Sequence, residues 1–291
     1  MRIAFEHVGY SYPGTGAPTQ PQAAGQPHAQ ALQDVTFALE EGMVLGIAGK
    51  TGSGKSTLMR HMNGLLHPTS GRVTVDGADL ALPQTQQELR GKVGLVFQYP
   101  EHQLFAATVE EDVAFGPVNL GASKEEAAAR VRTALAQVGL DYEEVAQASP
   151  FALSGGQQRR VAIAGVLAMQ PQVLVLDEPA AGLDPAAHAS LLQLVARLHG
   201  QGMSVALVSH NMDDLAQLCT HMLVLNEGRV ILKGTPAQVF TQEDALAAAG
   251  LEPPQAQQMA NELRAEGVPL PEDAFFPTAE SLADALAALA R

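Results

Sequence analysis

A glycine-rich stretch in the first quarter of the chain has residue types and spacing suited to holding a triphosphate. It fits the pattern G-x-x-x-x-G-K-[ST], in which glycines let successive backbone N–H groups turn inward toward phosphate oxygens. A helical pattern at 57–66 follows the stretch, so a helix N-terminus adds its dipole. Lys55 can reach the β- and γ-phosphates, and the Ser56 hydroxyl can bind Mg²⁺. The stretch consists of Gly49, Lys50, Thr51, Gly52, Ser53, Gly54, Lys55, Ser56 and Thr57.

Four continuous apolar runs indicate strands that are covered on both faces, as in a parallel α/β sheet. Each run ends in polar residues, and the glycine-rich stretch follows the first run. Ligands of open α/β sheets bind outside the carboxyl ends of the strands, so we expect the four strand ends to face one triphosphate. The runs lie at 44–48, 93–97, 173–176 and 205–208.

Polar side chains at the other three strand ends can act on phosphate. Asp177 follows a Val-Leu-Val-Leu run and can hold Mg²⁺, directly or through water, and Glu178 beside it can orient or deprotonate an attacking water. Gln98 has a neutral amide that can bind Mg²⁺ and respond to the γ-phosphate. His210 can hydrogen-bond the γ-phosphate and the water. An isolated Asp-Glu pair is usually a solvated turn, so this interpretation depends on the buried strand and the glycine-rich stretch.

A second glycine-containing helix start lies farther along the chain. Two glycines and a serine at a helix N-terminus form a second anion site. One nucleotide already has a phosphate loop, so the second site needs another explanation. Two chains placed head to tail can each bring this helix start to the γ-phosphate of the other. The residues concerned are Ser154, Gly155, Gly156 and Gln157.

Composition limits the classes of partner. The net charge of the 291 residues is −14, so nucleic acid is not the expected partner. The one cysteine, Cys219, cannot form an internal disulfide and lies in an apolar helical pattern where we expect packing. The N-terminus lacks the apolar region of a signal peptide, and no run approaches the roughly 18 apolar residues of a membrane span. We therefore expect a soluble protein whose membrane role, if any, comes through a partner.

The remaining elements surround this predicted sheet. The stretch Pro13–Gln30 is rich in Pro, Gly, Ala and Gln, which predicts a solvated loop. Tyr10 and Tyr12 precede that loop, and an aromatic residue there can stack on a purine base. Further strands are predicted at 3–12, 32–39, 72–77, 222–225 and 229–232, and further helices at 123–138, 153–169, 185–198, 254–266 and from 278 onward.

The order of these motifs resembles that of ATP-binding cassette ATPases, including Asp184 in the sequence Ala-Gly-Leu-Asp. The resemblance implies an α/β P-loop NTPase with a parallel core sheet, an N-terminal antiparallel β subdomain, a helical subdomain at about 99–165 and a small C-terminal helical extension. We expect the nucleotide-binding domain to span 1–240 and the extension, as a dimerisation element, to span 241–291. The resemblance also implies ATP and Mg²⁺ as ligands and favours Tyr12 as the base-stacking residue.

Three stretches match a narrower group, the ATPases of energy-coupling factor transporters, and in particular the second of two paralogous ATPases. The stretches are 96–105, 111–117 and 157–169. This resemblance implies an importer at the cytoplasmic face of a bacterial membrane. Its partners are a second ABC ATPase subunit (a paralogue or a copy of the chain), a transmembrane energy-coupling subunit, and a small membrane protein that captures a vitamin or other micronutrient. Ala180 stands where a threonine is common, at a position without a catalytic role.

Three alternatives can be weighed. A soluble cassette ATPase acting on DNA or ribosomes needs a long coiled-coil insertion or two cassettes in tandem, and the chain has neither. A small-molecule kinase has no use for the helix start at Ser154 or for Asp184. A cobalt or nickel importer stays open, because the ATPase never meets the transported substrate.

Two segments suggest contacts with partners. Tyr99–Phe105 directly follows Gln98 and includes Leu104 among its large side chains, so we expect it to contact the transmembrane subunit; a small local core is the alternative. Residues 241–291 have few large apolar side chains, so we expect no independent core there. Their apolar faces then pack on the cassette or on a second copy. The resemblance to energy-coupling factor ATPases implies the second arrangement, in which the extension holds two subunits together when nucleotide leaves.

Overall fold

The computed structural model describes residues 1–13 and 30–289, so residues 14–29 of the predicted solvated loop lie outside the described chain. The chain forms two compact units. The first consists of Met1, Glu41–Leu45 and Gln87–His210, and the second consists of Arg2–Glu40, Gly46–Gln86 and Asn211–Arg291.

The first unit contains parallel strands, as the continuous apolar runs predict. Strand β7 (Val173–Asp177) pairs in parallel with β6 (Val93–Val96) and with β8 (Ser204–Val208). The side chains of β7 and β8 are buried along nearly their whole length, which explains why these strands lack polar alternation. Val205 N donates to Met43 O over 2.9 Å, just before β3 (Val44–Ala48) begins.

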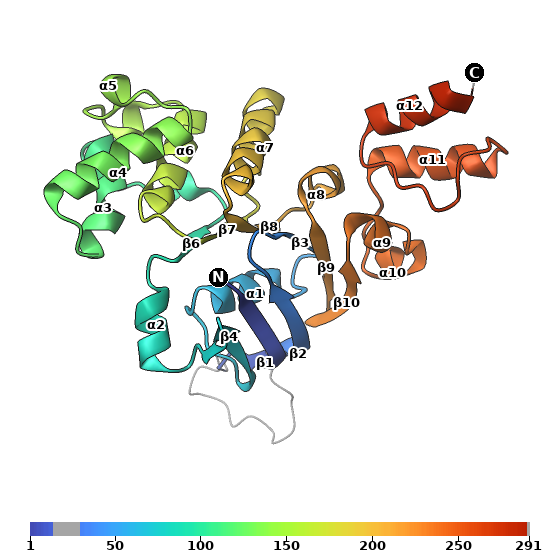
Figure 1. Ribbon diagram of the computed structural model, residues 1–291, viewed down its shortest axis with the longest axis horizontal. Coiled ribbons are helices and arrows are strands. Elements are labelled where there is room, and N and C mark those ends of the chain that lie inside the picture. The colour runs from blue at the N-terminus through green and yellow to red at the C-terminus, as the bar shows by residue number, and fades with distance from the viewer. Residues whose placement is uncertain (14–29, 290–291) are drawn as a thin grey trace, which may run out of the picture. The chain divides into compact units, whose positions relative to one another are not determined.

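Helices of the first unit begin at recognisable caps. Ser123 and Ser154 each form a capping box with the residue three positions later, at the starts of α4 (Lys124–Gln137) and α6 (Gly155–Leu167). Helix α3 (Val109–Asn119) packs against both, as Figure 1 shows in green. The other helices are α2 (Pro83–Leu89, which starts in the second unit), α5 (Tyr142–Val145), α7 (Pro185–Gly200) and the short 3₁₀ turns Pro100–Gln103 and Pro150–Ala152.

The second unit contains the predicted antiparallel β subdomain. Its strands are ordered β2-β1-β4-β5, and β1 pairs antiparallel with both β2 and β4. Phe5 on β1 stacks on Phe37 on β2 with ring centroids 4.6 Å apart. Cys219 is buried, and burial together with the charge of Asp214 raises its pKa to about 12, so the thiol is a packing group as expected. The four strands of this sheet are β1 (Ile3–Ser11), β2 (Gln30–Leu39), β4 (Ser70–Val75) and β5 (Ala78–Asp79). The second unit also contains a hairpin that belongs to the other sheet, formed by β9 (His221–Asn226) and β10 (Arg229–Gly234).

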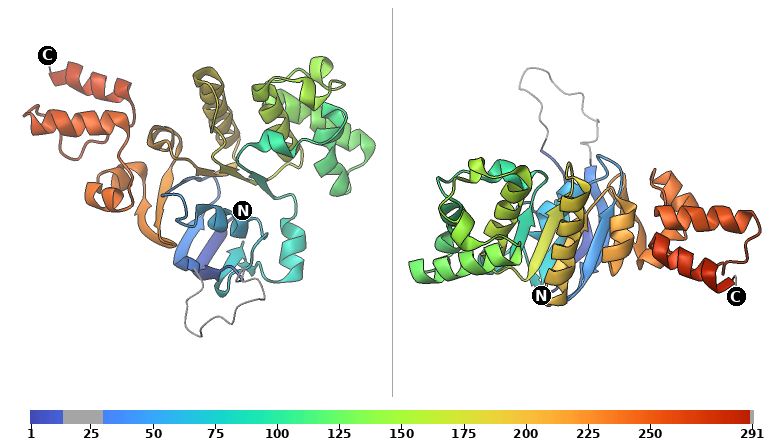
Figure 2. Two further views of the ribbon diagram at one scale, coloured as in Figure 1. Left: turned by 180° about the vertical axis from the view of Figure 1, so that it is seen from behind. Right: turned by 90° about the horizontal axis from the view of Figure 1, so that it is seen from above.

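The C-terminal segment corrects one expectation, because it does form a small core of its own. Helices α11 (Gln255–Ala265) and α12 (Ala279–Leu289) lie side by side in Figure 2. The prolines between them fold the chain back, so Phe276 is buried and its N–H donates to Gln257 Oε1 over 2.9 Å. The cluster consists of Ala256, Ala260, Leu270, Phe276 and Leu282.

The same segment also packs on the rest of its own unit, through α8 (Met212–Leu218), α9 (Pro236–Phe240) and α10 (Glu243–Ala248). Phe275 stacks on Phe240 at 5.8 Å, and Gln255 N donates to Asp213 Oδ1 over 2.9 Å. Gly250 has φ of 62°, and a Cβ there would overlap the side chain of Lys50. The extension therefore docks on its own chain and touches the glycine-rich stretch.

Candidate functional site

The phosphate loop lies in the second unit, between β3 and α1 (Lys55–Met62). Gly52 and Gly54 have φ of 82° and 106°, in the left-handed region where a side chain would be strained. The Lys55 ammonium donates to Gly49 O over 2.6 Å and to Lys50 O over 3.0 Å, so the loop curls around this charge. The sequence thus folds here into a turn whose N–H groups and lysine can surround an anion.

Two further observations show that the loop fits phosphate. The Ser53 hydroxyl is buried and has no hydrogen-bond partner within residues 1–13 and 30–289, so a phosphate oxygen would satisfy it. A Cβ on Gly49 would collide with Leu225 O and would lie 2.6 Å from Ser53 Oγ, so the backbone approach here requires glycine. The turn is held from behind by Gly228 N, which donates to Ser53 O over 3.0 Å.

The two candidate base-stacking tyrosines have different surroundings. Tyr10 is 7% exposed and packs edge-on against His61 at 4.9 Å. Burial lowers the pKa of His61 more than its hydrogen bond to Thr57 O raises it, so Tyr10 packs against a histidine ring whose neutral form is favoured. Tyr12 is 42% exposed, and its hydroxyl lies 3.0 Å from Thr57 Oγ1. Tyr12 therefore has a ring accessible to a ligand, next to the first turn of α1.

In the first unit, three predicted catalytic residues lie together. His210 Nε2 is 2.6 Å from Glu178 Oε1, and the Gln98 amide nitrogen is 3.5 Å from Glu178 Oε2. Glu178 has φ of 47°, which is unusual for a residue with a side chain, and its N–H donates to Val208 O over 3.0 Å. The end of β8 thus holds Glu178 in a strained conformation that points its carboxylate at both neighbours. Asp177 precedes it as the last residue of β7.

The second predicted anion site forms the start of α6. Ser154 Oγ accepts from Gln157 N over 3.4 Å and donates to Gln157 Oε1 over 2.9 Å. Ser154 and Gly155 are exposed, and a Cβ on Gly155 or Gly156 would meet open space, so this helix start is accessible from outside. Asp184 caps α7, and its Oδ1 accepts from Ala186 N and Ala187 N over 2.9 Å each.

A cavity of about 500 Å³ lies next to the start of α6 and to Asp184 at the start of α7. Gly156 and Asp184 both line it, together with Arg160, Leu183 and Leu194. Arg159 also lines it and is paired with Glu101, and the sequence predicted neither this contact nor a role for Arg159. A signal for their charge-paired contact was an arginine close to the apolar run 161–167 of a helix predicted to be buried.

The similarity of this chain to known proteins identifies its family. The model of the ABC transporter family matches residues 32–181. The energy-coupling factor transporter ATP-binding protein EcfA2 of Symbiobacterium thermophilum is 52% identical over 275 residues, which cover 94% of this chain and 92% of that protein. The chain belongs to the ATP-binding subunits of energy-coupling factor transporters.

Solved structures of cassettes resemble this member of the family. One is cbiO1 from Clostridium perfringens, described as part of the ABC transporter complex cbiONQ, with a TM-score of 0.72, 34% identity, and coverage of 90% of this chain and 98% of that one. Another is the dimeric post-hydrolysis state of an ATP-binding cassette bound to ADP and phosphate, with a TM-score of 0.68, 29% identity, and coverage of 80% and 98%.

Membership confirms the predicted fold class and activity: the protein is an ATP-hydrolysing subunit of an energy-coupling factor transporter. The small-molecule kinase and the ATPase acting on DNA or ribosomes are excluded. Over residues 1–13 and 30–289, no helix has the length and apolar character needed to cross a bilayer. Membership of this family, not the lack of a spanning helix, implies membrane partners within a transporter complex.

Proposed function

We propose that this subunit binds Mg²⁺-ATP and uses Glu178 to activate the attacking water, and that hydrolysis drives uptake of a vitamin or other micronutrient. A cobalt or nickel ion is the alternative cargo. The observation that supports the catalytic part is the contact of the Glu178 carboxylate with both His210 and Gln98. A carboxylate held between a strand-end imidazole and amide is suited to accept a proton from water.

The proposed roles divide between binding and proton transfer. The loop Gly49–Gly54 and Lys55 hold the triphosphate, Thr57 contacts it from the first turn of α1, and Tyr12 stacks on the base. Glu178 takes the proton of the attacking water. Its two neighbours, His210 and Gln98, hold the carboxylate in place.

The oxygen donors of Ser56, Gln98 and Asp177 suit a magnesium ion. A hydroxyl, an amide and a carboxylate are the hard ligands that Mg²⁺ prefers, and the ion keeps several waters beside a few protein ligands. When bound, Mg²⁺ neutralises negative charge on the β- and γ-phosphates. Among residues 1–13 and 30–289, no cluster of three or more His, Cys, Asp or Glu offers a competing site.

The exposed helix start at Ser154 supports a head-to-tail pair of cassettes, formed with a paralogue or with a second copy. Its capping box is complete, and Ser154 and Gly155 are exposed, as contact with an anion from another subunit requires. A relative solved as a dimer bound to ADP and phosphate supports a pair of cassettes. In this arrangement Ser154, Gly155, Gly156 and Gln157 contact the partner's γ-phosphate, and Asp184 lies near the same interface.

An apolar groove supports docking of the transmembrane energy-coupling subunit. It has a volume of about 310 Å³ and is lined by Phe105, Phe115 and Leu120. Phe105 is 59% exposed and packs edge-on against Phe115, which is 52% exposed, at 4.9 Å. Leu104 is instead buried, so only part of Tyr99–Phe105 can face a partner. The proposed complex also contains a small membrane protein that captures the substrate. In this complex the subunit lies peripherally on the cytoplasmic face of the membrane.

The proposed function predicts ATP-driven uptake by the complex purified in gentle detergent and placed in vesicles. Replacing Phe105 and Phe115 with serine should lower uptake by about tenfold or more, while ATP hydrolysis by the isolated subunit stays within about twofold. Leu82→Ser, an exposed leucine of the second unit, serves as the control and should leave both rates unchanged. Unchanged uptake and assembly in the phenylalanine variant would contradict docking at this groove.

We propose that the cassette spans 1–240, with a helical subdomain at about 99–165, and that the extension 241–291 holds two subunits together between hydrolysis cycles. Met259 on α11 and Leu289 on α12 are exposed apolar residues that a second subunit can cover.

Ending the chain after Glu252 should therefore weaken association by about tenfold or more in the absence of ATP, because α11 and α12 are lost. Gly250 and its contact with Lys50 are kept, so ATP binding should not change. Sedimentation with the partner ATPase, nucleotide removed, measures this effect. Undiminished association would show that the extension only docks on its own chain.

A further inference from the structure

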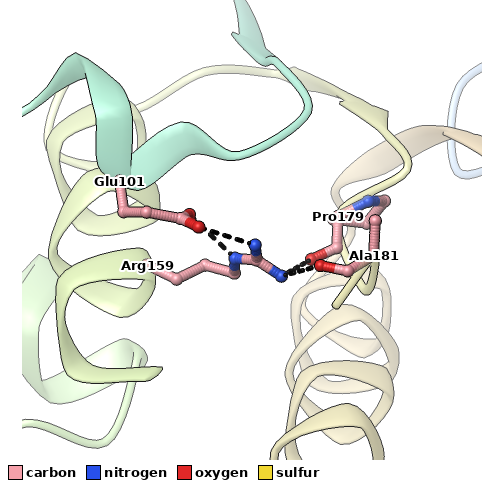
Figure 3. Close-up of polar contacts among 4 residues, drawn as sticks. All are labelled: Glu101, Arg159, Pro179 and Ala181. Atoms are coloured by element: carbon pink, nitrogen blue, oxygen red, sulfur yellow. Dashed lines mark hydrogen bonds and ion pairs between the residues drawn. The ribbon is translucent and has the colours of Figure 1, made fainter. Parts of the chain in front are cut away.

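Arg159, on the second turn of α6, makes an unusual set of contacts. Its side chain is buried; the whole residue is 4% exposed. As Figure 3 shows, Nε and Nη2 donate to the two carboxylate oxygens of Glu101 over 3.0 and 2.8 Å. On the other side, Nη1 donates to Pro179 O over 3.1 Å and to Ala181 O over 2.8 Å. One guanidinium therefore connects three segments of the first unit.

These contacts depend on the shape and charge of arginine. The planar fork matches the carboxylate with two parallel bonds and still has a nitrogen directed at the carbonyls. Burial alone would raise the pKa of Glu101, but the hydrogen bonds and charge of Arg159 outweigh it, so the pKa is lowered and the pair is ionic. A lysine has a single compact ammonium, which cannot hold the carboxylate and both carbonyls in the same geometry.

The segments that Arg159 joins are those nearest the proposed chemistry. Glu101 lies in the 3₁₀ turn Pro100–Gln103, three residues after Gln98. Pro179 directly follows Glu178, and Glu178 itself contacts Gln98. The segments 98–101 and 178–181 are thus connected at two points. Gln98 contacts Glu178 directly, and a few residues farther along each segment Arg159 bonds to both. A shift of the turn that bears Glu101 must move Arg159, and with it the backbone that holds Glu178.

We propose that Arg159 is a positioning residue that makes the geometry of Glu178 depend on the segment leading to the apolar groove. This proposal rests on the proposed role of Glu178. Glu101 acts only through Arg159, by holding its guanidinium in line with Pro179 O and Ala181 O. Docking of a partner at the Phe105 groove, four residues after Glu101, would then change the rate of hydrolysis through this connection.

The test measures kcat and KM for ATP, together with uptake per ATP hydrolysed in the reconstituted complex, for Arg159→Lys, Glu101→Gln and the double variant. A displaced carboxylate should lower kcat by about ten- to a hundredfold for each single variant, with KM changed by less than about twofold. The double variant should be no worse than either single one, because both remove the same connection. Uptake per ATP should fall as well, because docking of the partner at the Phe105 groove no longer controls hydrolysis.

The exposed pair Arg132 and Glu143 supplies matched controls. The two side chains contact each other at 2.6 Å, so Arg132→Lys and Glu143→Gln change the same chemical groups at the surface of this unit and should leave every rate unchanged. Normal kcat in Arg159→Lys would overturn the proposal, and so would a loss of kcat that only follows a lower Tm. Glu178→Gln separates the two hypotheses. If that variant keeps turnover, the proposed role of Glu178 fails; if it loses turnover while Arg159→Lys does not, only the role of Arg159 fails.

Discussion

Replacing Glu178 with glutamine should lower kcat for ATP by about 10²–10⁴-fold while ATP binding stays unchanged. Glutamine keeps the size of the side chain and can still contact His210 and Gln98, but it cannot accept the proton of the attacking water. The residues proposed to hold the triphosphate are all retained. Phosphate release under saturating ATP measures the rate, and binding of a fluorescent ATP analogue measures affinity.

Glu227 provides a matched control for this substitution. It is an exposed glutamate with φ of 48°, close to the 47° of Glu178, so Glu227→Gln tests the effect of changing a glutamate on a left-handed backbone. We expect no change of kcat in the control. Turnover within about tenfold of normal in Glu178→Gln would show that another group activates the water.

A mixed pair of inactive subunits should regain activity. Lys55→Ala removes a charge from the phosphate loop, and Ser154→Arg fills the exposed helix start, so a pair carrying either change in both chains should lose about 10²-fold or more of its rate. When one chain has each change, head-to-tail geometry places both lesions in one composite site and leaves the other intact. The mixed pair should then hydrolyse ATP at about half the normal rate, as expected for two independent sites.

Two affinity tags allow the mixed pair to be isolated from the parent pairs. If the natural partner is a paralogue, Lys55→Ala stays in this chain and the serine substitution goes into the corresponding helix start of the paralogue. A mixed pair as inactive as its parents would mean that Ser154 serves the nucleotide of its own chain. The same preparations, assayed for ATP binding, distinguish a lost site from a lost reaction.

The strands with continuous apolar runs could be predicted closely. Runs at 44–48 and 205–208 match β3 and β8 within one residue, because strands covered on both faces need no polar alternation. Helix α3 was not predicted, although Thr108 and Glu111 form a capping box at its start. Its Gly116 and Pro117 look like a stop signal, but the helix continues through both.

Side chains whose burial depends on the chain folding back were harder to predict. Phe276 and Leu270 lie among prolines without helical spacing, so the sequence did not indicate the cluster that they form with α11 and α12. The position of Leu104 inside, next to an exposed Phe105, has the same cause: a turn rather than a periodic element decides which side chain points inward.

The candidate site likewise contains residues whose positions the sequence predicts and residues whose contacts it does not. The proximity of Glu178 and His210 could be predicted. Glu178 directly follows β7, His210 lies two residues after the end of β8, and the ends of neighbouring parallel strands lie close together. Arg159 could not, since two of its partners are backbone carbonyls and the sequence does not show which carbonyls a side chain will reach.

The contact between Gly250 and Lys50 limits which sequences this protein can adopt. Position 250 favours glycine because of its positive φ, and a Cβ there would also require the flexible end of the Lys50 side chain to move aside. The residue type at position 250 of the extension therefore depends on a loop some 200 residues earlier in the sequence. Among natural variants, a side chain at 250 should occur together with a shorter residue at 50, so the two positions should change as a pair.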